Sequence, residues 1–398
     1  MDIRKLIRET LEKNLSEIDT AGDFSDVKFS CLSPAVVVRW LNDELDRLNF
    51  NRDAPQKDTI KRGNKDIIMS RKGIESIMDD DRNINLNMFI RNLTMEPDSI
   101  FDHNPKMEKS DEGRPQLTVN TGLPAIVGIV YDMEHEKFYS VPTCPSAGEC
   151  QIGCYARKAF YGMDDSKIMK LTRRLNLLLN DPEKYKQMIF NELEPIAKNL
   201  KTSSIGMKDK IQLVIRWNDA GDFFGQKYFN IARDVTRELL KRGYNVKSYA
   251  YTKRSEYVIE LDKDKNFVIN FSTDAHSKDI QKMKEYDPER NKAKYSHKVG
   301  VASNLFKDIF EKKGPHYVKG YGDKPIFTSE EAPEILKDRI YEKYKDEFKF
   351  TRDSLAYTFE LPVKIGKPNK YNVIVLPTGD SDIGAQREDV GISFLLEH

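Results

Sequence analysis

The spacing of apolar residues along the chain changes from helical to strand-like and back. In residues 2–18 apolar side chains recur every three or four positions, which predicts an amphipathic helix, and residues 34–48 carry a second apolar helical pattern. Residues 49–115 are polar and are interrupted by Pro and Gly. We expect residues 1–115 to be a helical N-terminal extension whose later part is loose or partly ordered.

From residue 116 onward, short apolar runs alternate with helical patterns. Strand material is expected within residues 117–132, around a turn at Asn120–Pro124. Further strands are expected at residues 137–141, 211–217, 246–251, 267–271, 298–302 and 373–376. Helices are expected at residues 165–179, from 182 onward, and at 227–242, 255–261, 278–285 and 329–349. Asp181 followed by Pro182 is typical of a helix start, with Asp as the N-cap and Pro at the first helical position.

Strands that are separated by helices indicate βαβ units and a parallel sheet. The pattern therefore predicts an α/β protein with a central core over residues 116–310. The helical extension, residues 1–115, precedes this core, and a C-terminal extension of mixed helices and strands, residues 311–398, follows it.

The composition limits the function classes. The 398 residues include 65 basic and 64 acidic side chains, a net charge of +1, so bulk charge does not drive nucleic-acid binding, while a local basic face stays open. The longest apolar runs, such as residues 124–131, are far shorter than the roughly 18 residues of a membrane span. The charged start of the chain has no apolar signal-peptide core. We expect no membrane contact and a cytoplasmic location.

Three of the four cysteines lie within eleven residues, as Cys144, Cys150 and Cys154 with spacing C-x5-C-x3-C. Clustered thiols in a reducing compartment more often bind a metal than form disulfides. Structural zinc needs four ligands, so Cys31 or a histidine would complete a zinc site. A [4Fe–4S] cluster on three cysteines leaves one iron open for S-adenosylmethionine, SAM. We favour the cluster over zinc, and three buried thiols without metal are the third alternative.

Polar residues directly follow several predicted strands. In parallel α/β sheets, catalytic and binding residues lie at these carboxyl ends of the strands. If the strands share one sheet, these ends converge on one mouth. The candidates are Arg216, Asn218, Asp219, Gly221 and Asp222; Thr252, Lys253 and Arg254; Ser272, Thr273, Asp274 and His276; and Ser303 and Asn304.

The candidate cofactor-binding residues are Arg216, Asn218, Asp219, Gly221, Asp222, Thr252 and Arg254. Asp219 and Asp222 would hold the amino group or ribose of a bound nucleoside such as SAM, or they are ordinary turn and N-cap residues.

The cationic candidates and the proton-transfer candidates also have two interpretations each. Arg216, Lys253 and Arg254 would bind a carboxylate or phosphate, or they are solvated charges. Asp274 and His276 would transfer protons, with Lys253 as a further catalytic candidate, or they form a local turn pair.

Four segments resemble the phage gene product 88 family in the same order. They are Cys144–Lys158, with Cys-Tyr-Ala from Cys154; Arg174-Leu-Asn176 with Asp181-Pro182; Arg216–Phe224; and Tyr251–Arg254. The resemblance covers about residues 116–275. The cysteine loop, the Gly-Asp-Phe turn and the Thr-Lys-Arg segment also resemble radical-SAM proteins of phages, in which the cluster loop follows the first strand of a partial (β/α) barrel.

The resemblance implies a partial (β/α) barrel, a [4Fe–4S] cluster on the three cysteines and a radical-SAM-like activity in a host cytoplasm. A nucleic-acid or nucleotide substrate follows by analogy with phage DNA modification. The usual radical-SAM spacing is C-x3-C-x2-C, and this chain differs at both gaps. Many members of the gene product 88 family have further cysteines shortly before an Ile-x-Phe tail. This chain keeps such a tail at residues 392–394, but residues 376–386 hold no cysteine, so any second metal site of the family is expected to be absent here.

Two rival functions stay open. One is a zinc-binding module that recognises nucleic acid without catalysis. The other is a base-exchange enzyme of the transglycosylase type, in which Asp219 and Asp222 serve as acid and nucleophile and the cysteines are structural.

Overall fold

The computed structural model describes most of the chain. The described residues are 24–50, 74–79, 83–102, 111, 114–148, 154, 165–207, 210–261, 264–298, 316–318, 324–326, 331–357, 372–376, 382–388 and 390–395. The helix predicted over residues 2–18 lies outside them, as do Cys150, Ser303 and Asn304.

Two compact units share the chain, and they interleave along the sequence. The first contains residues 1–102, 121–196 and 218–238, and the second contains residues 103–120, 197–217 and 239–398. Within the described parts of both units, no helix is both long enough and apolar enough to cross a membrane.

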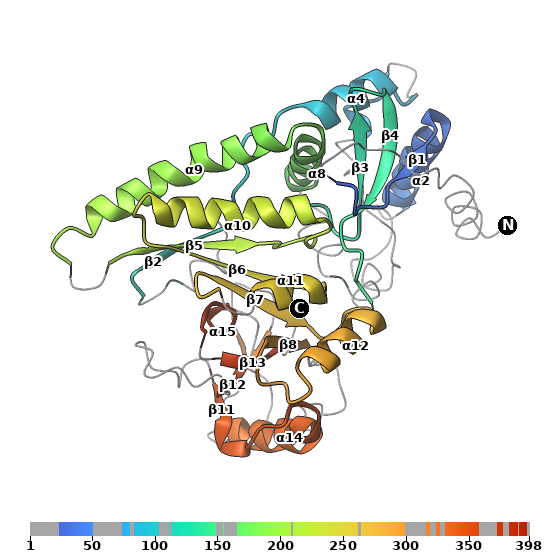
Figure 1. Ribbon diagram of the computed structural model, residues 1–398. Coiled ribbons are helices and arrows are strands. Elements are labelled where there is room, and N and C mark those ends of the chain that lie inside the picture. Colours follow the sequence, from blue (N-terminus) through green and yellow to red (C-terminus); the bar gives the residue numbers. More distant parts are fainter. Residues whose placement is uncertain are drawn as a thin grey trace. The chain divides into compact units, whose positions relative to one another are not determined.

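The first unit holds a small antiparallel sheet and helices (Figure 1). The sheet has the order β1-β4-β3. The strands and helices of the first unit are β1 (Ser30–Leu32), α2 (Pro34–Phe50), α4 (Leu86–Thr94), β3 (Val127–Asp132), β4 (Lys137–Pro142), α8 (Asp165–Asn180), and most of α9 (Pro182–Ser203) and α10 (Gln226–Lys241). The predicted start of α9 is confirmed, because the Asp181 carboxylate accepts the Lys184 N–H at 2.9 Å.

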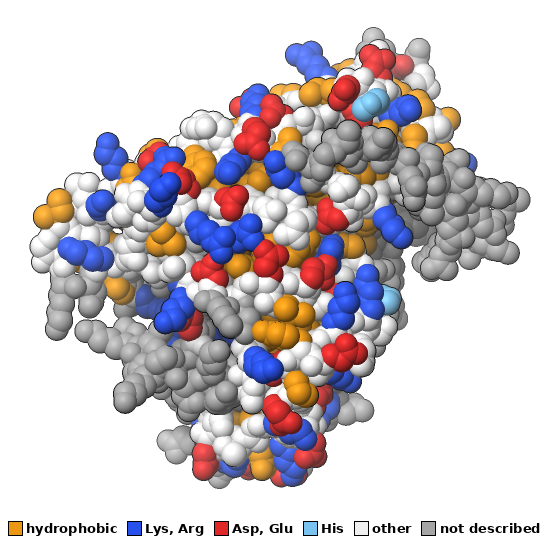
Figure 2. Space-filling view, in the orientation of Figure 1, with side chains coloured by type: hydrophobic (Ala, Val, Ile, Leu, Met, Phe, Trp, Pro, Cys, Tyr) orange, Lys and Arg blue, Asp and Glu red, His pale blue; other side chains and the backbone are white. Residues whose placement is uncertain are grey.

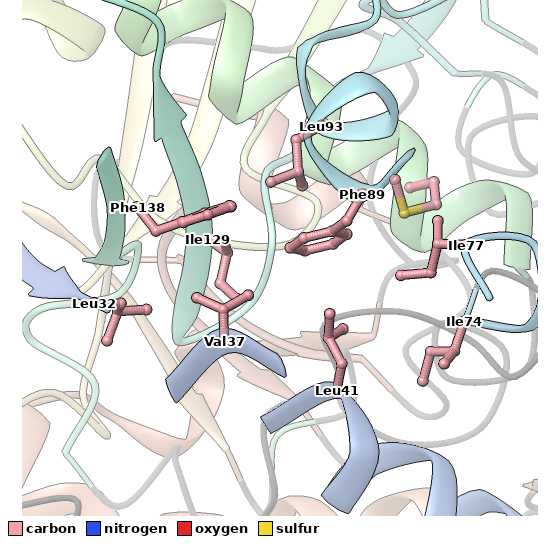
Figure 3. Close-up of a cluster of buried hydrophobic side chains, with 10 residues drawn as sticks. Leu32, Val37, Leu41, Ile74, Ile77, Phe89, Leu93, Ile129 and Phe138 are labelled. Carbon is pink, nitrogen blue, oxygen red and sulfur yellow. The ribbon is translucent and has the colours of Figure 1, made fainter. Parts of the chain in front are cut away.

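One core joins the early part of the chain to this sheet (Figure 3). Its buried members are Leu32, Val37, Leu41, Ile74, Ile77, Phe89, Leu93, Ile129, Phe138 and Met169. Phe89 of α4 stacks on Phe138 of β4 with ring centroids 6.1 Å apart. Described parts of the polar stretch 49–115 therefore contribute apolar side chains to a packed core.

Side chains of α8 cover β3, an edge strand of the small sheet. The Asn176 amide donates to the Ile129 carbonyl at 2.9 Å, and its oxygen accepts the Tyr131 N–H at 2.9 Å. Asn180 donates to the Tyr131 carbonyl at 3.0 Å. These amides satisfy backbone groups that an edge strand leaves unpaired.

The second unit is built on an eight-stranded sheet with the order β11-β12-β13-β8-β7-β6-β5-β2. Every neighbouring pair in it is parallel, which confirms the predicted α/β class with a parallel sheet. Its strands are β2 (Gln116–Asn120), β5 (Gln212–Trp217), β6 (Val246–Thr252), β7 (Phe267–Ser272), β8 (Lys294–Lys298), β11 (Leu355–Tyr357), β12 (Asn372–Leu376) and β13 (Val390–Leu395).

Helices and a hairpin complete the second unit, and α11 packs on β6 and β7. These elements are α11 (Ser255–Leu261), α12 (Ser277–Tyr286), the hairpin β9 (His316–Val318) and β10 (Lys324–Ile326), α14 (Glu331–Phe348), a 3₁₀ helix (Arg352–Ser354) and α15 (Ile383–Gln386). The strand predicted at residues 298–302 lies mostly outside the described residues. The strand described here is β8, which spans Lys294–Lys298 and buries Tyr295 and Ser296.

The short helix α15 lies on one face of the parallel sheet, where Ala385 packs against Val214, Tyr249 and Val268. The Lys294 ammonium anchors this segment by donating to three carbonyl oxygens around the end of α15, those of Gly384, Arg387 and Val390. The C-terminal strands β12 and β13 therefore belong to the same sheet as β5–β8.

Candidate metal centre

The cysteine loop follows β4 of the small antiparallel sheet in the first unit. The predicted strand before the loop is thus present, but it is not a strand of the parallel sheet. Cys154 is buried and Cys144 is half-buried, and both pack with Ile126 and Ala147 in one apolar cluster. Cys150 lies outside the described residues. Among those that are described, no group of three or more potential ligands is arranged to hold a metal ion.

Ile126 contacts Cys144 through both of its backbone polar groups. The Ile126 N–H donates to the Cys144 sulfur at 3.4 Å, and the Ile126 carbonyl accepts the Cys144 N–H at 3.3 Å. Ile126 has a φ of 69°, in the left-handed region that a β-branched residue rarely occupies. Such strain persists only where surrounding structure imposes it, and it concentrates at functional sites.

The turn after β5 is hydrogen-bonded to the cysteine loop within the first unit. The Asp222 N–H donates to the carbonyl of Thr143, directly before Cys144, at 2.9 Å. The Asp219 N–H donates to the Thr121 carbonyl at 2.8 Å. Both carboxylates are buried, and that of Asp222 also accepts the Phe223 N–H at 2.7 Å.

Two glycines allow this close docking. A Cβ on Gly122 would lie 2.8 Å from the backbone nitrogen of Ala220, so a side chain does not fit. Gly221 has a φ of 78°, which favours glycine. Gly221 is therefore required by the conformation of the turn.

Asn218 also has left-handed backbone geometry, with a φ of 59°. Its side-chain oxygen accepts the Tyr228 hydroxyl at 3.0 Å. Burial raises the pKa of Tyr228 well above 10.0, so this hydroxyl remains a donor. The Asn218 amide nitrogen is buried and has no hydrogen-bond partner within the described part of the chain. The Asn218 side chain is thus fixed through its oxygen, and its amide N–H groups are available as donors.

Arg216 lies in the second unit and is buried against a carboxylate of its own chain. Its guanidinium is 3.0 Å from Asp382, the residue directly before α15. Asp382 also accepts the Tyr249 hydroxyl at 2.9 Å. The prediction that Arg216 binds a carboxylate therefore has an internal candidate, which the sequence did not reveal.

The residues after β6 make local contacts at the start of α11. The Thr252 hydroxyl accepts the Arg254 N–H at 3.1 Å. Arg254 pairs with Glu256, and its guanidinium lies 5.0 Å from the ring centre of Tyr257.

Of the catalytic candidates, the structure brings Lys253 and Asp274 together. The Lys253 ammonium is 3.7 Å from the Asp274 carboxylate, and both side chains are about one-sixth exposed. His276 is exposed and is the N-cap of α12, where its ring accepts the Lys278 N–H at 3.3 Å.

A second histidine lies within β8, the strand that pairs with β7. His297 of β8 is 2.7 Å from the Thr273 hydroxyl and packs against Tyr344, Phe348 and Phe394. Burial, with the nearby Lys343 charge, lowers the pKa of His297 to about 4, so its ring is neutral at physiological pH.

The segment around Arg174 that resembles the family is held by a buried ion pair. Arg174 is fully buried and lies 2.8 Å from the Asp102 carboxylate, which also pairs with Lys170. Burial raises the pKa of the Asp102 carboxyl, but the Arg174 and Lys170 charges outweigh this effect. The pKa of Asp102 therefore lies below its usual 3.8. Sequence spacing alone could not identify Asp102 as this partner.

The charged side chains do not gather in one patch on the face drawn in Figure 2, where Lys and Arg are interspersed with Asp and Glu. The fold and the cysteine loop together define an α/β protein with an eight-stranded parallel sheet in one unit and a candidate metal centre in the other.

A comparison with known protein families then shows the family to which this α/β protein belongs. The family model described as Gene product 88 matches residues 99–313, more than half of the chain, so the chain belongs to that family. Neither the curated proteins nor the solved structures gave a match.

Proposed function

We propose that this protein is an iron–sulfur protein with a radical-SAM-like activity. Cys144, Cys150 and Cys154 would hold a [4Fe–4S] cluster. The observation that carries the proposal is that Cys144 and Cys154 pack in one apolar cluster while the Ile126 N–H is directed at the Cys144 sulfur. Thiolate ligands and N–H donors to sulfur are the chemistry that iron–sulfur sites use.

When bound, a cluster with one iron not ligated by cysteine supplies the electron that cleaves SAM. The residues of the turn after β5 would bind and orient SAM, because Asp222 is hydrogen-bonded to the residue that precedes Cys144. The Asn218 amide donor suits a carboxylate, and the Asp219 and Asp222 carboxylates suit an amino group or ribose hydroxyls.

In the second unit, the Lys253–Asp274 pair is the candidate for proton transfer. We propose a partial (β/α) barrel for the parallel sheet, whose order from β2 to β11 suits that architecture. A nucleic-acid or nucleotide substrate, in a phage or mobile-element setting, completes the proposal and rests on family context.

The test is anaerobic purification followed by an absorbance spectrum and iron, sulfide and zinc analysis. Wild type is compared with Cys150→Ala, and Cys31→Ala serves as the control, because Cys31 lies in β1 outside the loop. We expect a brown band near ~400 nm and roughly four irons per chain, absent from Cys150→Ala and present in Cys31→Ala.

A colourless protein with about one zinc would overturn the proposal and favour the zinc-binding module. Loss of activity in Asp222→Asn, with Cys→Ala variants that only unfold, would favour the base-exchange enzyme.

A further inference from the structure

Two hydroxyl groups flank Cys144 and are buried without a partner. Thr143 and Ser146 are both fully buried. Neither the Thr143 Oγ1 nor the Ser146 Oγ has a hydrogen-bond partner within the part of the chain that the structure describes. A buried hydroxyl that makes no hydrogen bond costs free energy, so native structures rarely retain one without a reason.

The backbone around these hydroxyls is fixed, although the hydroxyls themselves are not engaged. The Thr143 carbonyl accepts the Asp222 N–H at 2.9 Å, and the Ala147 N–H donates to the Cys144 carbonyl at 3.1 Å. The turn from Thr143 to Ala147 is therefore held in place by its backbone. The hydroxyls of Thr143 and Ser146 have no partner among the described residues, so both are donors available to a bound group.

The observed sulfur contact shows what kind of acceptor suits this place. Cys144 already accepts the Ile126 N–H, from a residue whose backbone is strained. The surrounding side chains, Ala125, Val127 and Ala147, are apolar and offer no competing acceptors. A negatively charged sulfur centre would accept hydrogen bonds from all the nearby donors.

We propose that the Thr143 and Ser146 hydroxyls are positioning donors to the sulfur atoms of the group that Cys144 holds, and that they raise its reduction potential. The inference rests on the proposed iron–sulfur function. Reduction adds one electron and no atoms, so the negative charge on the sulfurs increases. Hydrogen-bond donors stabilise that added charge and favour the reduced state.

The experiment compares Thr143→Val and Ser146→Ala with wild type in anaerobic redox titrations, with dithionite as the reductant. Each variant removes one hydroxyl at nearly constant shape. We expect the equilibrium constant for reduction to fall about tenfold in each variant, a potential more negative by about 59 mV for a one-electron couple.

The matched control is Thr172→Val, because the Thr172 hydroxyl is also buried but donates to the Ile168 carbonyl at 2.9 Å. Its reduction potential should equal that of wild type.

A second readout uses the metal-free protein. There, Thr143→Val should raise the melting temperature, because it removes a buried hydroxyl that has no partner, whereas Thr172→Val should lower it. A structural role for Thr143 would lower stability in both the metal-free and the loaded protein.

The outcomes separate this inference from the function on which it rests. Wild type with a cluster, but with unchanged potentials in both variants, overturns the inference and leaves the proposed function standing. A lower melting temperature for metal-free Thr143→Val also overturns it. Wild type without a cluster under anaerobic reconstitution overturns both.

Discussion

The buried ion pair between Arg216 and Asp382 should hold α15 on the parallel sheet. Both side chains are almost fully buried, at 3% and 1% exposure, and the pair distance is 3.0 Å. Asp382→Asn preserves the shape and an acceptor for Tyr249, but it leaves the guanidinium without its counter-charge. Breaking one side of a buried pair costs about 3–5 kcal/mol. That is a large fraction of a typical total stability of about 5–15 kcal/mol.

The assay is urea unfolding followed by tryptophan fluorescence. The chain has two tryptophans, and Trp217 is buried in β5 next to Arg216. A Trp40→Phe background therefore reports on the second unit alone. Glu388→Gln is the matched control, because the Glu388–Lys247 pair lies in the same segment but is partly exposed. Such exposed pairs contribute about 0–1 kcal/mol.

The double variant Arg216→Met, Asp382→Asn should lose less stability than the sum of the two single variants, because no charge is left buried and unpaired. If Asp382→Asn costs no more than Glu388→Gln, the reasoning about the buried charge is refuted.

Three further predictions test the first unit. Phe89→Ala should lower the free energy of unfolding by about 3–5 kcal/mol because Phe89 is fully buried in the core, whereas exposed Met88→Ala should change it by less than about 0.5 kcal/mol in urea unfolding. Gly122→Ala should cost about 1–3 kcal/mol because its Cβ meets backbone atoms of Ala220; an unchanged free energy of unfolding would contradict the docking geometry. The lowered pKa of Asp102 adds stability that is fully present above about pH 4 and is lost as the pH falls through the pKa of the folded state. Asp102→Asn should therefore make the free energy of unfolding depend less on pH in the acid range. An unchanged pH dependence would contradict the pairing.

Much of the fold was predictable because its elements carry local signals. The apolar runs of β5, β6 and β7 and the periodic helices between them are found within one or two residues of the predicted positions. The prediction missed residues 294–297 of β8, because this part of the strand is made of Lys, Tyr, Ser and His rather than an apolar run. The position of β13 beside β8 depends on pairing between distant segments, which local patterns do not encode.

The candidate site could be predicted where ligand-type and polar residues lie close together in the sequence. The cysteine loop and the turn from Asn218 to Asp222 were both identified from local residues, and the structure ties them together. The internal partner of Arg216 could not be found, because Asp382 lies far along the chain. The flanking hydroxyls of Thr143 and Ser146 were visible in the sequence, but only burial without partners distinguishes them from ordinary loop residues.

The most direct test of the central claim is electron paramagnetic resonance of the dithionite-reduced, anaerobically purified protein, with and without SAM. The account predicts a signal from a reduced cluster in wild type that changes shape when SAM is added, because three cysteines leave one iron open to a small molecule. A reduced-cluster signal that SAM leaves unchanged, or no cluster signal at all, would contradict it.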